Sequence, residues 1–148
     1  MKVIARDFFT SEEQDDIKLA IMNSELDTSG EIRVHIESVC KGEVLDRAAY
    51  MFKKLGMAKT AERNGVLIYL AISNRKFAII GDSGIHNKVP PDFWDNIKLK
   101  MLDFFRDGKF SDGLIYAISE TGIHLKQYFP HSKDDVNELP DDISFGKK

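Results

Sequence analysis

The sequence predicts one α/β domain in which a small mixed β-sheet of three to four strands is sandwiched by helices. Three observations lead to this fold class. Segments with helical spacing alternate with segments rich in strand-forming residues. Hydrophobic residues make up 43% of the 148 positions, which is enough for a core. A chain of about 150 residues also forms a single core more readily than two. The expected order of elements is α-β-α-β-β-α-α.

The first two elements are a helix and a strand. Thr10 and Glu13 have the spacing of a capping box, so a helix should begin after Thr10 and end near Leu26. Residues 31–37 then alternate between apolar and polar side chains, which is typical of a strand covered on one face only. The covered face should carry Ile32, Val34 and Ile36, and the solvated face Glu31, Arg33, His35 and Glu37.

A second helix and a pair of strands follow. Residues 43–55 return to helical spacing, and Gly56 suits the left-handed position after a helix. The apolar run 64–72 predicts a central strand, and 77–82 predicts the next one. Because only a short turn separates these two strands, we expect a hairpin with Asn74 at positive φ.

The last part of the chain contains two more expected helices. Apolar positions in 91–106 and 111–128 recur with helical spacing, and Pro130 stops the second helix. Residues 131–148 are polar and without period, so we expect a loose tail there. The domain itself is then expected to span residues 1–130.

Composition argues against several classes of function. The net charge is −3 and the pI is about 5.8, so the chain does not attract nucleic acid or anionic lipid. Cys40 is the single cysteine, which excludes an intramolecular disulfide, and we expect it to be a buried small residue. No apolar run approaches the ~20 residues of a membrane span. We therefore expect a cytoplasmic protein as written, although a chain trimmed of a signal or an anchor would look the same.

The predicted topology brings separate polar residues together. A right-handed crossover makes the strands at 31–37 and 64–72 parallel, so their first residues meet at one end of the sheet. The hairpin returns the end of the strand at 77–82 to the same place. The residues gathered there should be Glu31, Thr60, Arg63, Asn64, Asp82 and Ser83.

This cluster suggests two kinds of chemistry and one plain alternative. Glu31, Asn64 and Asp82 offer the oxygen ligands that Ca²⁺ or Mg²⁺ prefers, and Arg63 could clamp a phosphate held there. Alternatively, Asp82 could act as a nucleophile on a phosphoryl group, with Glu31 as general acid or base. The plain alternative is structural: Asp82 caps the next turn, and the charged residues only pair. Ligands of open α/β sheets usually bind at the opposite, carboxyl ends of parallel strands.

Short motifs with a characteristic order and spacing run through most of the chain, from Phe8 to Pro130. They are Ser29 to Ile32; Thr60 with Arg63 to Ile68; Ile80 to Asp82 with Gly84 and Ile85; Phe105 with Gly108, Phe110 and Asp112 to Leu114; and Tyr128 to Pro130. Together they resemble the TPM domain, a family named from a thylakoid-lumen protein, a photosystem repair factor and a receptor auxiliary protein.

The resemblance implies a compact α/β sandwich with Glu31, Arg63, Asn64 and Asp82 as signature positions. Plant members of this family are described as acid phosphatases and can carry calcium, whereas other members help to assemble or tune membrane protein complexes. Family members usually have a signal sequence before the domain and a membrane segment or glycine-rich tail after it. This sequence shows neither, which favours a cytoplasmic or trimmed version.

Two functional hypotheses follow. The first is a phosphatase-like hydrolase assisted by Ca²⁺ or Mg²⁺, with Asp82, Glu31 and Arg63 as catalytic residues and a phosphorylated small molecule or protein as substrate. The second is a non-enzymatic interaction module that helps to assemble or regulate a membrane-associated complex, with a membrane protein as partner. Neither hypothesis needs an organic cofactor, and neither involves nucleic acid.

Overall fold

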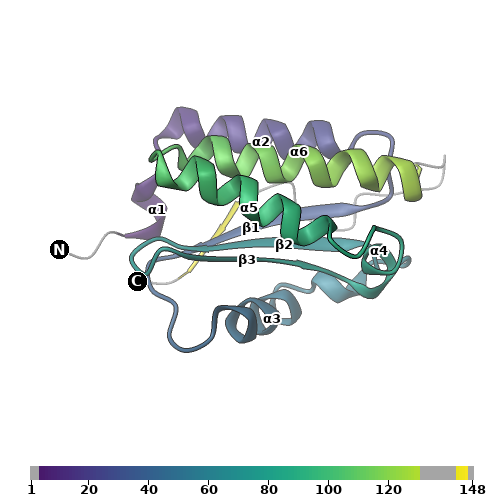
Figure 1. Cartoon of the computed structure of the whole chain (residues 1–148), viewed down its shortest axis with the longest axis horizontal. Coiled ribbons are helices and arrows are strands. Elements are labelled where there is room, and N and C mark those ends of the chain that lie inside the picture. Colours follow the sequence, from purple (N-terminus) through teal and green to yellow (C-terminus); the bar gives the residue numbers. More distant parts are fainter. Residues whose placement is uncertain (1–3, 131–142, 147–148) are drawn as a thin grey trace.

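The computed structural model describes residues 4–130 and 143–146 and confirms the α/β class. Its centre is a four-stranded mixed sheet in the order β3-β2-β1-β4. Helices α2, α5 and α6 lie on one face of this sheet and α3 lies on the other, so the domain has three layers (Figure 1). The strands are β1 (Glu31–Glu37), β2 (Gly65–Ala71), β3 (Lys76–Gly81) and β4 (Ile143–Phe145).

The helices follow the expected order, with additional short ones. The predicted first helix begins after a complete capping box between Thr10 and Glu13, which confirms that expectation. A four-residue helix precedes it, a 3-10 turn lies before β2, and another four-residue helix follows β3. The full set is α1 (Ala5–Phe8), α2 (Ser11–Glu25), α3 (Val44–Lys54), η1 (Met57–Lys59), α4 (Ser83–His86), α5 (Phe93–Arg106) and α6 (Phe110–Tyr128).

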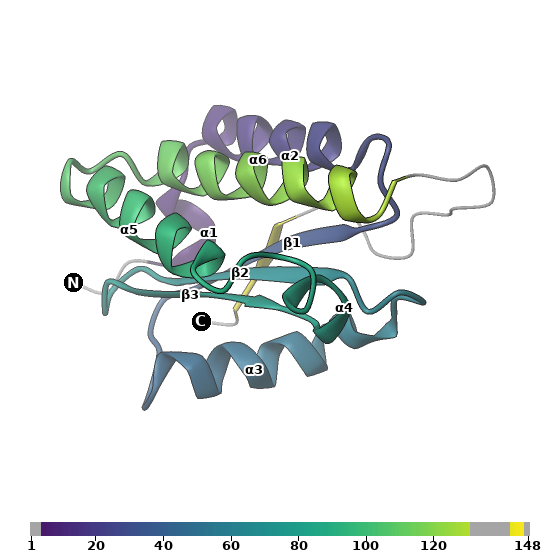
Figure 2. The same ribbon diagram turned by 45° about the vertical axis from the view of Figure 1, so that its right-hand side comes forward.

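The strand pairing agrees with the topology expected from the sequence. β1 and β2 are parallel, with Glu31 opposite Gly65. β2 and β3 are antiparallel, with Val66 opposite Gly81. Figure 2 shows the hairpin of β2 and β3 running above α3, with α5 and α6 on the other side.

Two local expectations are corrected in the turns. In the β2–β3 hairpin the residue at positive φ is Arg75 (φ 56°), not Asn74. Asn74 instead accepts a hydrogen bond at Oδ1 from the backbone N–H of Cys40. Gly56 does take the left-handed conformation after α3, with φ 76°.

The expectation of a loose tail is wrong for three of its residues. β4 adds to the free edge of β1 as a parallel strand, with Val34 opposite Ile143 and Ile36 opposite Phe145. A strand of three residues is too short to show a period, which is why the pattern did not reveal it. Residues 131–142 and 147–148 of the expected tail lie outside the described residues.

The expectation of a half-covered β1 is also wrong, because both faces of this strand are buried. The apolar face packs against the main core formed with α2, α5 and α6. The polar face lies on the α3 side of the sheet, next to a smaller core around Met57, Leu67 and Tyr69. Glu31, His35 and Glu37 are therefore 3%, 2% and 6% exposed, respectively.

Glu37 organises the buried polar groups beneath α3. The guanidinium of Arg47 donates to both of its carboxylate oxygens, at 3.0 and 3.2 Å, and the Tyr69 hydroxyl donates to Oε2 at 3.2 Å. The Nε2 atom of His35 lies 3.1 Å from Glu37 Oε1. On its other side, His35 Nδ1 lies 2.7 Å from Ser144 Oγ of β4. These partners satisfy the side chains of His35 and Glu37, which would otherwise be costly to bury.

Burial lowers the pKa of His35 below its ordinary value of 6.5, although the carboxylate of Glu37 partly opposes this shift. The unfolded chain therefore binds a proton at His35 more readily than the folded protein does. Below pH 6.5 this difference favours unfolding, so the stability that neutral His35 provides is complete above pH 6.5 and is lost as the pH falls toward the lowered folded pKa.

We expect the free energy of unfolding to fall as the pH is lowered from about 7 through the range below 6.5, and His35→Gln to reduce this slope. Urea titrations at a series of pH values would measure it. His86→Gln is the matched control, because His86 is exposed. An unchanged slope in His35→Gln would show that His35 does not cause the pH dependence.

Candidate functional site

The ends of three neighbouring strands meet beside α4, at the right of Figure 1. The backbone N–H of Asp82 donates to the carbonyl of Gly65 at 2.9 Å, and the N–H of Glu31 donates to the carbonyl of Asn64 at 3.4 Å. These bonds place Asp82 and Glu31 on either side of the Asn64–Gly65 step. The structure therefore brings together the three residues that the sequence nominated as metal ligands, at the end of the sheet that the topology predicts.

Arg63 and Asp82 form a bidentate ion pair at this edge. Nε of Arg63 lies 2.6 Å from Oδ2 of Asp82, and Nη2 lies 2.8 Å from Oδ1. The Asp82 side chain is 7% exposed whereas that of Arg63 is 53% exposed, so the guanidinium covers a buried carboxylate from the solvent side. The hydrogen bonds that Arg63 donates to Asp82, together with the negative charge of that carboxylate, raise the pKa of Arg63. Both carboxylate oxygens of Asp82 are thus already engaged.

Asp82 has a second, structural contact. Its Oδ1 accepts a hydrogen bond of 2.7 Å from the N–H of Ser83, at the start of α4. The residues that follow β3 therefore form a short helix, which Asp82 caps. The structural alternative therefore correctly predicted that Asp82 caps the next turn. The same side chain also forms the ion pair with Arg63.

The loop before β2 packs tightly against α4. Gly84 donates its N–H to the carbonyl of Arg63 at 2.8 Å. A Cβ atom at Gly84 would lie 2.1 Å from the carbonyl oxygen of Glu62, so only glycine allows this approach. Arg63 itself has φ 52°. This contact fixes the backbone from which the Arg63 side chain reaches Asp82.

Asn64 is the most enclosed polar side chain of the edge, with 1% of its surface exposed. Its backbone N–H donates to Thr60 Oγ1 at 3.1 Å, and its Nδ2 donates to Ser29 Oγ at 3.1 Å. The Ser29 hydroxyl gives its own proton to Glu62, so it must accept from Asn64, which fixes the orientation of the amide. The remaining atom, Asn64 Oδ1, is buried and has no hydrogen-bond partner.

The sequence missed Ser29 and Glu62, which complete this hydrogen-bond chain. Ser29 stands directly before Gly30 and Glu31, so its place in that motif was the available signal. Glu62 gave no signal, because its contact with Ser29 joins residues 33 positions apart.

The donor chemistry of the edge suits a weakly held hard cation. Glu31 and Asp82 supply carboxylates, and Asn64 supplies an amide oxygen that no protein group uses. Within the described part of the chain, no group of three or more His, Cys, Asp or Glu side chains could by itself hold a metal ion. A cation here would therefore depend on the Asn64 oxygen and on water, and it would compete with Arg63 for Asp82.

Comparison with known proteins identifies the family and the fold of this chain. Residues 3–122 match the TPM domain. No curated protein matches the chain. In the described residues, no helix has both the length and the apolar character needed to cross a membrane.

Several solved structures share the fold. The chain is 45% identical to the BA42 protein of the psychrophilic bacterium Bizionia argentinensis, with a TM-score of 0.87, and the match covers 95% of this chain and 97% of that one. The N-terminal domain of a protein from P. gingivalis shares the fold at 16% identity, with a TM-score of 0.68 and coverage of 85% and 83%. An N-terminal domain from Corynebacterium glutamicum does so at 14%, with a TM-score of 0.65 and coverage of 84% and 79%. The chain therefore belongs to the TPM domain family.

Proposed function

We propose that this TPM domain binds a divalent cation, Ca²⁺ or Mg²⁺, through Glu31, Asn64 and Asp82, and acts as a phosphatase-like hydrolase at the same edge. The observation that carries the proposal is the amide oxygen of Asn64. A buried acceptor without a partner costs about 1–3 kcal/mol, and a cation between carboxylates would remove that cost. Because the site offers few charged ligands, we expect a dissociation constant on the order of 10⁻⁴–10⁻³ M.

The ion pair between Arg63 and Asp82 gives this proposal a specific form. A cation bound at Asp82 would repel the nearby guanidinium, whose side chain is half exposed and can move toward solvent. Arg63 would then be free to hold two oxygens of a phosphate group in bidentate fashion. The same arginine would shield Asp82 when no cation is bound and clamp the substrate when one is.

Each residue has a distinct task in the proposed hydrolysis. A bound cation supplies Lewis-acid polarisation of a phosphoryl oxygen. Asp82 and Asn64 would bind the cation, and Arg63 would orient the phosphate. Glu31, 3% exposed at the start of β1, would bind the cation through one carboxylate oxygen and would use the other as general acid or base.

Calcium titration followed by amide NMR tests the cation site. We expect saturable shifts confined to the backbone around Glu31, Asn64 and Asp82, and at least about tenfold weaker binding in Asp82→Asn. Arg63→Gln should bind Ca²⁺ more tightly than the wild type, because it removes a competing positive charge. Titration with Mg²⁺ distinguishes the two metals.

Unchanged spectra at millimolar Ca²⁺ and Mg²⁺ would contradict the cation site and leave the edge with a structural role. Weaker binding in Arg63→Gln would also contradict it, because the guanidinium would then support the cation rather than compete with it.

Hydrolysis of an aryl phosphate tests the proposed reaction separately. The release of phosphate should require Ca²⁺ or Mg²⁺ and should fall by about 10²-fold or more in Glu31→Gln, as expected for loss of an acid–base group. Arg63→Gln should mainly raise KM. His86→Gln, which changes an exposed residue of the adjacent α4, is the control. Activity that survives both Glu31→Gln and Asp82→Asn would rule out this assignment of residues.

An exposed apolar stripe favours a second function, that of an interaction module for a membrane-associated complex. Leu19 and Met22 of α2 and Leu26 just after it are 54%, 51% and 60% exposed, respectively. Their spacing of three and four residues places them on one side of the helix. Apolar side chains grouped in this way often mark a protein contact.

A partner that binds this stripe should be retained by the wild-type domain and lost by the variant with Leu19→Ser, Met22→Ser and Leu26→Ser. The control is Leu99→Ser, which removes one leucine of α5 that is 64% exposed. This variant should retain the partner. Equal retention by all three proteins would exclude the α2 stripe as the contact.

A further inference from the structure

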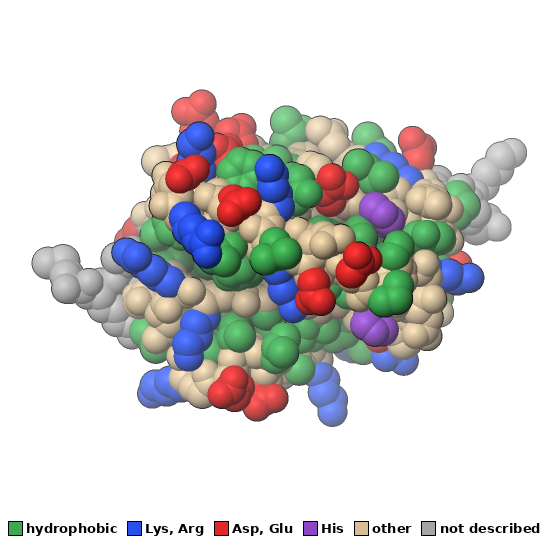
Figure 3. Space-filling view, viewed as in Figure 1, with side chains coloured by type: hydrophobic (Ala, Val, Ile, Leu, Met, Phe, Trp, Pro, Cys, Tyr) green, Lys and Arg blue, Asp and Glu red, His purple; other side chains and the backbone are tan. Residues whose placement is uncertain are grey.

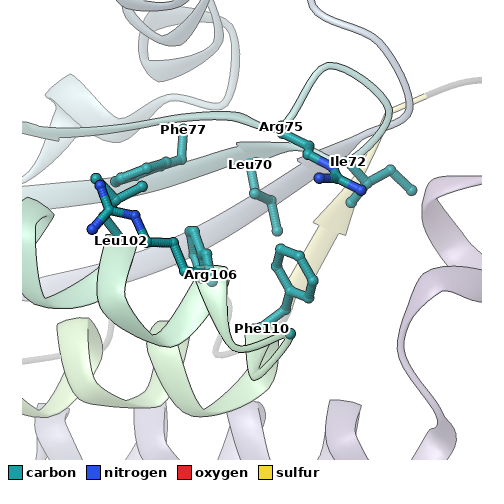
Figure 4. Close-up of a pocket in the computed structure, with 9 residues that line it drawn as sticks. Leu70, Ile72, Arg75, Phe77, Leu102, Arg106 and Phe110 are labelled. Atoms are coloured by element: carbon teal, nitrogen blue, oxygen red, sulfur yellow. The ribbon is translucent and has the colours of Figure 1, made fainter.

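We propose that a cavity at the opposite end of the sheet binds a small organic anion with an apolar body, of the arylalkyl or medium-chain carboxylate class. The cavity has a volume of about 280 Å³, just below the usual range for ligand pockets. It lies between the β2–β3 turn and the loop that joins α5 to α6 (Figure 4). Its lining residues are Leu70, Ile72, Arg75, Phe77, Leu102, Phe105, Arg106, Gly108 and Phe110.

The position of this cavity is one that ligands commonly use. Leu70 and Ile72 mark the carboxyl end of β2, and ligands of open α/β sheets bind at the carboxyl ends of parallel strands. The Glu31, Asn64 and Asp82 edge lies at the amino ends of β1 and β2. The cavity is therefore separate from the proposed cation site, and the two can be tested independently.

The cavity walls are apolar and incompletely covered. Ile72, Phe77, Phe105 and Phe110 pack against the main core, yet each remains partly exposed. The ring centroid of Phe105 lies 5.1 Å from those of both Phe77 and Phe110, so the three rings form a continuous aromatic wall. A ligand with an apolar body would remove this surface from water, which is the main driving force for such binding.

Two arginines add a positive charge at the rim. Figure 4 shows the guanidinium groups of Arg75 and Arg106 on opposite sides of the cavity, with Leu70 between them. Both side chains are exposed. The carboxylate nearest to Arg106 is that of Asp103, at 3.9 Å, which is too long for a hydrogen bond. Within residues 4–130 and 143–146, no carboxylate forms a salt bridge with Arg75.

The backbone at Arg75 supports a role for its side chain. Arg75 has φ 56°, a conformation that glycine or asparagine adopts at lower cost than arginine does. An arginine at this position therefore adds backbone strain to the turn, and it places a guanidinium group at the rim of the cavity. Figure 3 shows Lys and Arg side chains gathered at the left of the view, over the end of the molecule that holds this turn in Figure 1.

The combination of an aromatic wall with two weakly engaged guanidinium groups selects the charge of the ligand. A carboxylate can accept hydrogen bonds from either arginine while its apolar body lies against Phe77 and Phe110. An alcohol of the same shape would gain the apolar contact and a weaker hydrogen bond without charge assistance, and an amine would be repelled.

The test is an amide NMR titration of the full chain with 4-phenylbutyrate, compared with 4-phenylbutanol and 4-phenylbutylamine. We expect saturable shifts at Leu70, Ile72, Phe77 and Gly108, and no shifts at Glu31 or Asp82. The carboxylate should bind at least about tenfold more tightly than the alcohol, as expected when hydrogen bonds to a charged group are gained.

The double variant Arg75→Gln with Arg106→Gln should bind the carboxylate no more tightly than the alcohol, with binding of the alcohol unchanged. Lys53→Gln with Lys54→Gln, which removes the same charge from exposed positions of α3 on the other face of the sheet, should keep the preference. Equal affinity for all three probes, or a carboxylate preference that survives in the arginine variant, would overturn the proposal. Shifts of these amides on changing the protein concentration without any probe would also overturn it, because a second copy of the chain would then occupy the cavity.

Discussion

The parallel pairing of β1 with β2 is the interaction on which the rest of the structure depends. It aligns Glu31 with Gly65 at one end and Glu37 with Ala71 at the other. The helix that crosses between the two strands must cover the sheet from one side, which leaves the other side for α2, α5 and α6. Both ends of the sheet then acquire their character from this register: an edge with the carboxylates of Glu31 and Asp82 and the amide of Asn64 at the start of the strands, and an apolar cavity beyond their carboxyl ends.

Burial of the polar face of β1 is the second constraint. Glu37 is acceptable beneath α3 because Arg47 and Tyr69 meet its oxygens there. Burial raises the pKa of the Tyr69 phenol, so this group remains a hydrogen-bond donor. The same principle applies at the other end, where Arg63 covers Asp82. In both places an arginine with an exposed part carries the charge that makes a buried carboxylate tolerable.

Local patterns predicted the elements well, whereas contacts between distant residues could not be predicted. The capping box at Thr10 and the meeting of Glu31, Asn64 and Asp82 followed from spacing and from the handedness of the crossover. The burial of both faces of β1 could not be predicted in this way. Arg47, the partner of Glu37, lies on α3, whose amphipathic pattern does not indicate which strand it covers. The bidentate geometry of Arg63 and Asp82 also depends on side-chain directions that a sequence does not show. The cavity was missed because its residues come from two strands, the turn between them, two helices and the loop that joins those helices.

The short strand β4 changes what the sheet presents to other molecules. Without it the sheet would end on β1, a seven-residue strand whose row of unpaired backbone groups could pair with another chain. With β4 in place, residues 34–36 of β1 are paired, and Ser144 bonds inward to His35. Short edge strands of this kind resist edge-to-edge aggregation. Residues 143–145 therefore shield the middle of β1 from pairing with another chain, in addition to forming the fourth strand of the sheet.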